Sequence, residues 1–238
     1  MTGLFRAVAE TGSTNADMLA LAAEGAAEGQ WLRADRQTAG RGRMGRNWSS
    51  PLGNFYGSTL VWPQSADPSP ASLAFVAGIA VHDALQRLCP ALTATLKWPN
   101  DIMVGPAKLA GILLERSGAG AVVVGIGINL AFHPTDLPRP VTSLAALGLP
   151  VPPVAHAQEV LADRFAAWLA VWRDAGLAAI AAEWRARAHA TGTRLSVTTP
   201  DGAVIDGVFD GLDEVGALNL RLADGSVRAI HAGDVFLI

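Results

Sequence analysis

The amino-acid sequence predicts a mixed α/β (α+β) fold over residues 1–190, followed by a small β-barrel over residues 191–238. Strand-like apolar segments at 109–115 and 121–129 are typical of central strands in a sheet. A long apolar segment at 71–88 predicts a helix. Beyond residue 191 the pattern changes to short β-rich runs, so we expect a domain boundary there.

The first part begins with polar residues that precede a helix. Ser13, Thr14 and Asn15 stand before an alanine- and leucine-rich helical segment at 16–23, and Thr14 with Asp17 resembles a capping box. Gly25 is a plausible helix stop. The remaining expected elements are strands at 31–36, 55–61, 93–97 and 101–104, helices at about 155–174 and 177–190, and irregular loops at 63–70 and 133–153.

The barrel prediction depends on five short runs separated by tight-turn sequences. The separators include Asp201-Gly202, Asp224-Gly225 and Gly233-Asp234, which favour turns between antiparallel strands. The expected strands lie at 194–199, 203–210, 217–222, 226–231 and 235–238.

Composition excludes several classes of function. Of the 238 residues 50% are hydrophobic and only 16% are charged, which indicates a globular chain. A formal net charge of −3 argues against a general nucleic-acid-binding protein. Cys89 is the single cysteine, so no disulfide can form within the chain. No secretory signal and no apolar run of about 18 residues is found, so we expect a cytoplasmic protein without a membrane partner.

Residues 40–46 read GRGRMGR and are followed at 47–51 by NWSSP. Glycine allows the backbone to approach a ligand closely, and arginine supplies a permanent charge with several donors for carboxylate or phosphate. The segment therefore predicts an anion-binding loop. It also matches the G-x-G-x-x-G pattern of dinucleotide sites, but that pattern needs a helix beginning inside it, and 47–51 cannot start one.

Three further motifs are weak when taken singly. Residues 97–101 read KWPND, which also fits a strand-turn-strand with exposed charges. Residues 108–115 read KLAGILLE, an apolar strand with a lysine at its start, and residues 125–129 read GIGIN at the end of another strand. In open sheets ligands bind at strand ends.

In this order, and with Ser13-Thr14-Asn15 and Gln37, these motifs resemble those of the biotin–protein ligases over residues 5–130. The resemblance implies a catalytic domain like that of class II aminoacyl-tRNA synthetases, with a mixed sheet, and an SH3-like C-terminal domain. It implies an ATP-dependent biotin–[biotin carboxyl-carrier protein] ligase that forms biotinyl-5′-AMP. Biotin is then transferred to a lysine of a biotin carboxyl carrier domain.

By resemblance, Lys108, Arg43 and Asp101 are the expected catalytic residues. The residues expected to bind biotin are Ser13, Thr14, Asn15, Gln37, Arg41, Gly42, Arg43, Lys108 and Gly111. Those expected to bind ATP or the adenylate are Arg43, Arg46, Trp48, Lys97, Asn100, Lys108 and Asn129. The covering loop at 139–143 lacks an aromatic residue that some members stack on adenine, so Trp48 is a possible substitute.

Asp101 has three possible roles: to orient or deprotonate the incoming lysine, to help place Mg²⁺ on the phosphates, or to pair with Lys97. No metal site is predicted beyond the Mg²⁺ that accompanies ATP. Because the motifs begin at residue 13, we expect a monofunctional ligase without an N-terminal DNA-binding domain. A lipoate–protein ligase is the alternative of the same superfamily, and a nucleic-acid-binding module is a remote one. The chain is expected to be a monomer or a homodimer.

Overall fold

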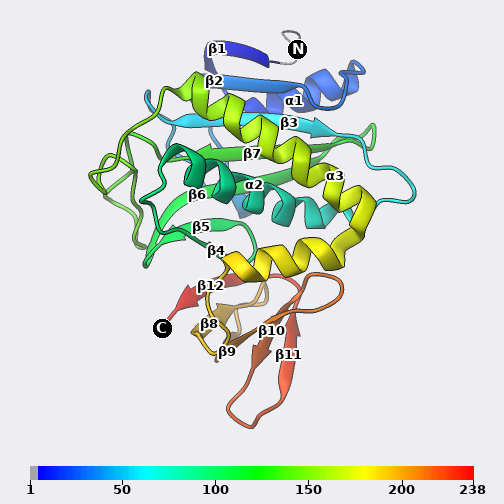
Figure 1. Ribbon diagram of the computed structural model, residues 1–238, viewed down its shortest axis with the longest axis vertical. Coiled ribbons are helices and arrows are strands. Elements are labelled where there is room, and N and C mark those ends of the chain that lie inside the picture. The colour runs from blue at the N-terminus through cyan, green and yellow to red at the C-terminus, as the bar shows by residue number, and fades with distance from the viewer. Residues whose placement is uncertain (1–4) are drawn as a thin grey trace.

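The computed structural model describes residues 5–238, which form a large sheet with helices packed on it and a second, smaller sheet (Figure 1). The strands of the large sheet are β1 (Phe5–Thr11), β2 (Trp31–Gln37), β3 (Phe55–Val61), β4 (Thr95–Lys97), β5 (Asp101–Val104), β6 (Ala107–Arg116) and β7 (Val122–Ile128). Their spatial order is β1-β2-β3-β7-β6-β5-β4. Only β1 and β2 pair in parallel. The predicted mixed sheet is confirmed.

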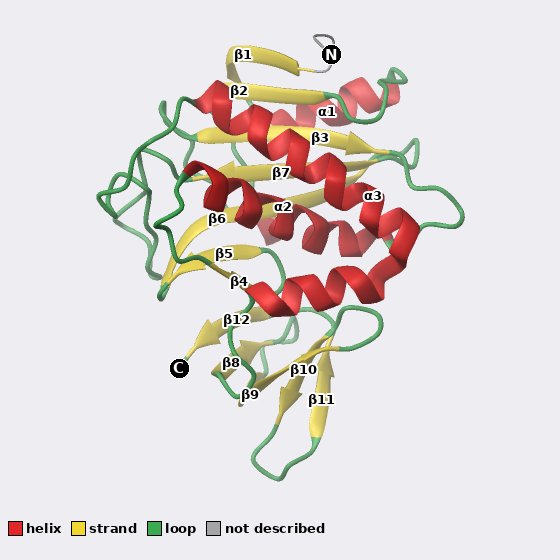
Figure 2. Cartoon of the chain, in the orientation of Figure 1, coloured by secondary structure: helices red, strands yellow, loops and turns green. Residues whose placement is uncertain are grey.

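Helices cover the two faces of this sheet unequally. Helices α2 (Leu73–Leu88) and α3 (Val154–Arg187) lie together on one face, in front of the sheet in Figure 2. Helix α1 (Thr14–Ala23) packs on the other face, where Met18 and Ala22 meet Leu32, Leu60 and Val123 in a small core. Because α1 is short, it covers only part of this face of the sheet, and the rest of the face is not covered by a helix.

Successive residues of β7 point to opposite faces, and the sequence divides accordingly. Val122, Val124, Ile126 and Ile128 belong to the large core under α2 and α3. Val123 belongs to the α1 core, so Gly125 and Gly127 share the α1 face. The alternation of branched residues with glycine therefore gives β7 one fully packed face and, beyond Val123, an opposite face without side chains.

Three local predictions have different outcomes. The two helices expected at 155–174 and 177–190 are the two halves of α3, which is interrupted at Gly176 with φ 76°. Among residues 5–238, α3 is the one helix that is long and apolar enough to cross a membrane, judged by length and composition alone. In the structure it packs on α2. The capping box is wrong: Ser13 is the N-cap without a side-chain cap hydrogen bond, and Asp17 instead accepts one from Thr11.

Strand β1 has no counterpart in the sequence prediction. It is an edge strand, and its residues are mostly exposed, so its sequence lacks the apolar alternation that marks a half-buried strand. Its partner β2 was expected at 31–36, where the structure places it.

The second sheet is the predicted C-terminal β unit, of the SH3-like kind. Its order is β11-β10-β9-β8-β12, and every neighbouring pair is antiparallel. It packs against the turn after β4, where the Trp98 indole donates a hydrogen bond to the Gly216 carbonyl at 3.1 Å. The strands are β8 (Arg194–Thr198), β9 (Val204–Leu212), β10 (Leu218–Arg221), β11 (Val227–Ile230) and β12 (Asp234–Leu237).

Candidate active site

A cavity of about 840 Å³, a volume that includes its solvent-open mouth, brings the predicted site residues together. It lies on the α1 face of the large sheet, between the start of α1, the loop at 40–46 (the arginine loop) and β12. The predicted residues that line it are Ser13, Thr14, Asn15, Gln37, Arg41, Gly42, Arg43, Arg46, Trp48, Lys97, Asn100, Asp101, Lys108 and Gly111. Asn129 is not among the lining residues.

Asn129 is placed elsewhere by its hydrogen bonds. It is 3% exposed, its amide donates to the Thr142 carbonyl at 3.0 Å, and its backbone carbonyl accepts from Leu144. These bonds fix the covering loop, whose Arg139 does line the cavity. Sequence reasoning assigned no role to Arg139, because a single arginine in a proline-rich loop resembles an ordinary surface charge.

The floor of the cavity consists of strand positions without side chains. A Cβ added at Gly125 would lie 2.1 Å from Asn15 Oδ1, and one at Gly127 would lie 2.6 Å from Trp48 Cε2. At Gly111 the same test meets Lys108 Nζ at 2.9 Å. Asn15, Trp48 and Lys108 therefore rest directly on the backbone of β6 and β7, and any larger residue at these glycines would displace them.

The cavity is strongly positive although the chain is mildly acidic. Six cationic side chains and two carboxylates are among its lining residues. The cations are Arg41, Arg43, Arg46, Lys97, Lys108 and Arg139, and the carboxylates are Asp101 and Asp234. Such a cavity favours an anionic ligand.

Asp101 lies between two lysines at the inner end. Its carboxylate forms an ion pair with Lys108 and lies 3.4 Å from Lys97 Nζ. Burial alone would raise the pKa of Asp101, but the charges of Lys108 and Lys97 outweigh it and hold that pKa below its usual value. Burial also lowers the pKa of Lys108, and Asp101 offsets this only in part. Of the three roles considered for Asp101, pairing with Lys97 is thus observed, together with a pairing to Lys108 that was not expected.

The arginine loop contains no α-helix, as the sequence predicted. Arg43–Gly45 forms one 3-10 turn, with Met44 at φ 57°, and Gly42 N donates to Arg46 O at 2.6 Å. The dinucleotide interpretation is excluded for this loop because no helix N-terminus is available for a pyrophosphate. Arg43 Nη1 donates to Asn100 Oδ1 at 3.3 Å, which joins the loop to the KWPND turn.

The C-terminal unit contributes to the cavity wall, which the sequence did not indicate. Asp234 accepts two hydrogen bonds from the Arg46 guanidinium, at 2.8 and 3.1 Å. Lys97 Nζ donates to the Val235 carbonyl at 3.0 Å. No sequence pattern predicts these hydrogen bonds, because their donors and acceptors lie more than a hundred residues apart in the chain.

The end of the cavity near α1 is polar and uncharged. Gln37 Oε1 accepts from the Thr14 backbone at 2.8 Å and from the Thr14 hydroxyl at 3.1 Å. Ser58, fully buried on β3, lies within hydrogen-bonding distance of both Thr14 Oγ1 (2.8 Å) and Asn15 Oδ1 (2.6 Å). Asn15 Nδ2 in turn donates to Glu115 at 2.7 Å. Ser58 was missed because it belongs to no motif, and Glu115, the last residue of the KLAGILLE segment, was assigned no role.

Trp48 connects the polar and cationic ends. Lys108 Nζ lies 5.3 Å from the centre of its ring, within cation–π range. Its indole Nε1 is buried and has no hydrogen-bond partner among residues 5–238. A buried donor without a partner costs free energy, so this N–H is available to an acceptor on a ligand.

Two family models match separate parts of the chain. The family described as "Biotin/lipoate A/B protein ligase family" matches residues 13–132, and "Biotin protein ligase C terminal domain" matches residues 192–238.

Several named relatives match nearly the whole chain. A protein named biotin–[acetyl-CoA-carboxylase] ligase from Paracoccus denitrificans is 42% identical, over 96% of this chain and 98% of its own length. The Mycobacterium tuberculosis protein of the same name is 38% identical, over 96% and 86% respectively. Among solved structures, the biotin protein ligase from Aquifex aeolicus in complex with biotin and ATP is similar with a TM-score of 0.88. It is 25% identical, and the match covers 99% of this chain and 100% of that one.

Proposed function

Because the chain belongs to the biotin/lipoate A/B protein ligase family, we propose that it is a biotin–protein ligase that uses ATP to attach biotin to a carrier protein. Relatives that match nearly the whole of it are named biotin–[acetyl-CoA-carboxylase] ligases. The observation that carries the proposal is the division of the cavity into a neutral polar end at Thr14 and Gln37 and a cationic end at Lys108 and Arg43.

This division suits the two substrates. The ureido head of biotin is neutral and hydrogen-bonding, so it fits the end formed by Ser13, Thr14 and Gln37. The valerate carboxylate of biotin and the α-phosphate of ATP are both anionic, and they repel one another as they meet. Lys108 and Arg43 supply the positive charge that lowers this cost.

The reaction has two steps. A carboxylate oxygen of biotin attacks the α-phosphorus, the bond from that phosphorus to the bridging oxygen breaks, and pyrophosphate leaves. The amine of the carrier lysine then attacks the acyl carbon, AMP leaves, and the amine gives up a proton. Arg46 and the arginine loop cover the mixed anhydride and limit its hydrolysis.

The Mg²⁺ expected with ATP arrives as part of that substrate. No group of three or more His, Cys, Asp or Glu side chains in residues 5–238 is arranged to hold a metal ion. Asp101, the carboxylate at the inner end, is already paired with two lysines, so it does not fit as a metal ligand. Its proposed role is to hold Lys97 and Lys108 in place.

Incubation with ATP, Mg²⁺, biotin and an apo-carrier domain tests the proposal. Intact mass should show one biotin added to the carrier, and omission of ATP should abolish the addition. Pyrophosphate exchange into ATP should depend on biotin. Exchange that depends on lipoate instead would replace this function with that of a lipoate–protein ligase.

A further inference from the structure

We propose that Ser50 is a positioning residue that connects the biotin-head end of the cavity to the arginine loop, an inference that rests on the proposed function. Ser50 is 6% exposed. Its hydroxyl accepts a hydrogen bond from Gln37 Nε2 at 2.9 Å and donates one to the Trp48 carbonyl at 2.9 Å. One buried hydroxyl thus contacts groups from both ends of the site.

The first of these bonds holds the nitrogen end of the Gln37 amide. Its oxygen accepts two hydrogen bonds from Thr14, so its nitrogen must face Ser50. An amide nitrogen carries two hydrogens, and Ser50 takes only one of them. The other is left for a ligand acceptor such as a ureido carbonyl. Without Ser50, the amide nitrogen loses its partner and the Gln37 side chain is held at its oxygen end alone.

The second bond fixes the base of the arginine loop. Gln37 N donates to the Ser50 carbonyl at 3.2 Å, and Trp48 N donates to the Gly40 carbonyl at 3.0 Å, so the loop is closed at its base. A Cβ at Gly40 would lie 2.5 Å from Trp48 O, 2.6 Å from Ser50 Oγ and 3.0 Å from Gln37 Nε2. These three groups therefore surround Gly40 so closely that only glycine fits.

The chemistry of adenylation should depend much less on Ser50. Lys108 and Asp101 belong to β6 and β5, where they are held by their own ion pair, and Lys108 is related to Ser50 only through the Trp48 ring. Arg43 has an independent anchor, because Asn100 accepts a hydrogen bond from its guanidinium. Loss of the Ser50 hydroxyl should therefore weaken biotin binding and loosen the loop, while the catalytic groups stay in position.

The test compares Ser50→Ala with Ser49→Ala, its exposed neighbour, and Gly40→Ala with Gly12→Ala, where an added Cβ meets no atom within 4 Å. Biotin-dependent pyrophosphate release is measured over ranges of biotin and ATP, and escape of biotinyl-AMP is followed by pulse-chase. For Ser50→Ala we expect KM for biotin to rise about tenfold, as for one lost hydrogen bond to an amide, and for Gly40→Ala, whose added Cβ displaces the same groups, we expect a rise at least as large. Their kcat should fall no more than about twofold, and the adenylate should escape faster.

Ser49→Ala and Gly12→Ala should behave as wild type. If Ser50→Ala matches Ser49→Ala in both measurements, Ser50 has no positioning role. A fall in kcat and thermal stability with unchanged KM for biotin would also overturn the proposal, because that is what a purely structural serine would give. If Ser50→Ala does not fold, Gly40→Ala decides alone, since it displaces the same three groups. Absence of biotin-dependent release in the wild type would instead refute the proposed function.

Discussion

At the scale of single residues, Lys108 is a nearly buried cation between a carboxylate and an aromatic ring. Its side chain is 10% exposed, forms an ion pair with Asp101, and lies against the Trp48 ring. We predict that Lys108→Ala reduces biotin-dependent pyrophosphate release by at least about a hundredfold, because the variant loses a buried positive charge at the point where the two anions meet. A radioactive exchange assay measures this directly.

The matched control for this prediction is Arg116→Ala. Arg116 ends the same strand, β6, but is exposed and does not line the cavity. It should retain the wild-type rate. Near-normal exchange by Lys108→Ala would show that the catalytic charge comes from the arginines of the loop instead.

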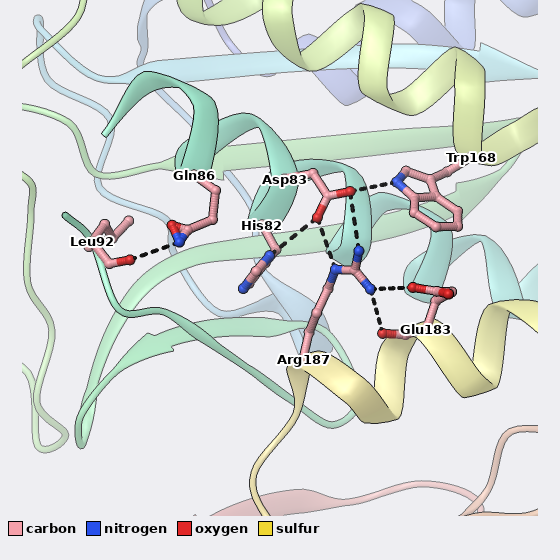
Figure 3. Close-up of polar contacts among 7 residues, drawn as sticks. All are labelled: His82, Asp83, Gln86, Leu92, Trp168, Glu183 and Arg187. Atoms are coloured by element: carbon pink, nitrogen blue, oxygen red, sulfur yellow. Dashed lines mark hydrogen bonds and ion pairs between the residues drawn. The ribbon is translucent and has the colours of Figure 1, made fainter. Parts of the chain in front are cut away.

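At the scale of secondary structure elements, Asp83 of α2 holds both halves of the interrupted helix α3 (Figure 3). Its carboxylate accepts hydrogen bonds from Trp168 Nε1 at 2.9 Å and from Arg187 Nε at 2.9 Å, and His82 Nδ1 lies 3.3 Å away. Trp168 precedes the break at Gly176 and Arg187 follows it. One side chain thus fixes the angle between the two halves.

This arrangement predicts a pH-dependent stability. Burial alone would raise the pKa of Asp83, but the hydrogen bonds from His82, Arg187 and Trp168 lower it to about 2. Because the folded-state pKa lies below the unfolded value of about 4, the stabilisation is complete above pH 4 and is lost as the pH falls toward 2. Asp83→Asn should therefore lower the free energy of unfolding by about 1 kcal/mol at pH 7, allowing for partial solvent exposure.

Urea unfolding at pH 7, 4 and 3 measures this effect. The difference between wild type and Asp83→Asn should shrink as the pH drops through 4. Asp163→Asn, an exposed position on α3, is the control and should show little difference at any of these pH values. A difference for Asp83→Asn that is independent of pH would mean that the carboxylate charge is not what holds α3.

The same scale shows why some of the fold and site was predictable from sequence and some was not. Elements with strong apolar periodicity, such as α2 and β7, were placed within one or two residues. Strand β1 was missed because an exposed edge strand carries no such period. Ser58, Arg139 and Asp234 were missed for another reason. Arg139 and Asp234 line the cavity and Ser58 supports two of its lining residues, Thr14 and Asn15, but all three do so through tertiary contacts that no local sequence pattern predicts.

At the scale of the whole molecule, Gly216 marks a close contact between the C-terminal unit and α2. It adopts φ +87°, and a Cβ there would lie 2.6 Å from Phe75 Cε2, whose side chain is buried. We predict that Gly216→Ala destabilises the protein by about 2–4 kcal/mol, of which roughly 1 comes from the positive φ and the rest from the forced separation of the two units. Denaturant unfolding gives the value.

Gly225→Ala isolates the contribution of the contact. Gly225 has nearly the same φ, +86°, in a turn of the same unit, but nothing lies within 4 Å of its added Cβ. It should lose only the roughly 1 kcal/mol due to backbone strain. Equal losses for the two variants would show that the contact with Phe75 does not hold the units together.

The positions of the lysines in the whole chain determine whether the enzyme can be acylated by its own reactive intermediate, biotinyl-AMP. The sequence has only two lysines, Lys97 and Lys108, and both lie in the cavity beside Asp101. Every other cationic side chain is arginine or histidine, and the arginine guanidinium stays protonated and so is not a nucleophile toward an acyl adenylate. The surface therefore offers an escaped biotinyl-AMP no lysine acceptor.

This predicts the behaviour of a leaking variant. Arg43→Gly removes the side chain that bridges the loop to Asn100, so biotinyl-AMP should escape and label lysines of an added bystander protein such as serum albumin. The variant itself should remain unlabelled on side chains by peptide mass spectrometry. Adding Arg228→Lys, at an exposed position on β11, should create one labelled site. Strong labelling of Arg43→Gly itself at Lys97 or Lys108 would contradict this, because it would mean that the cavity lysines, although paired with Asp101, are free to attack.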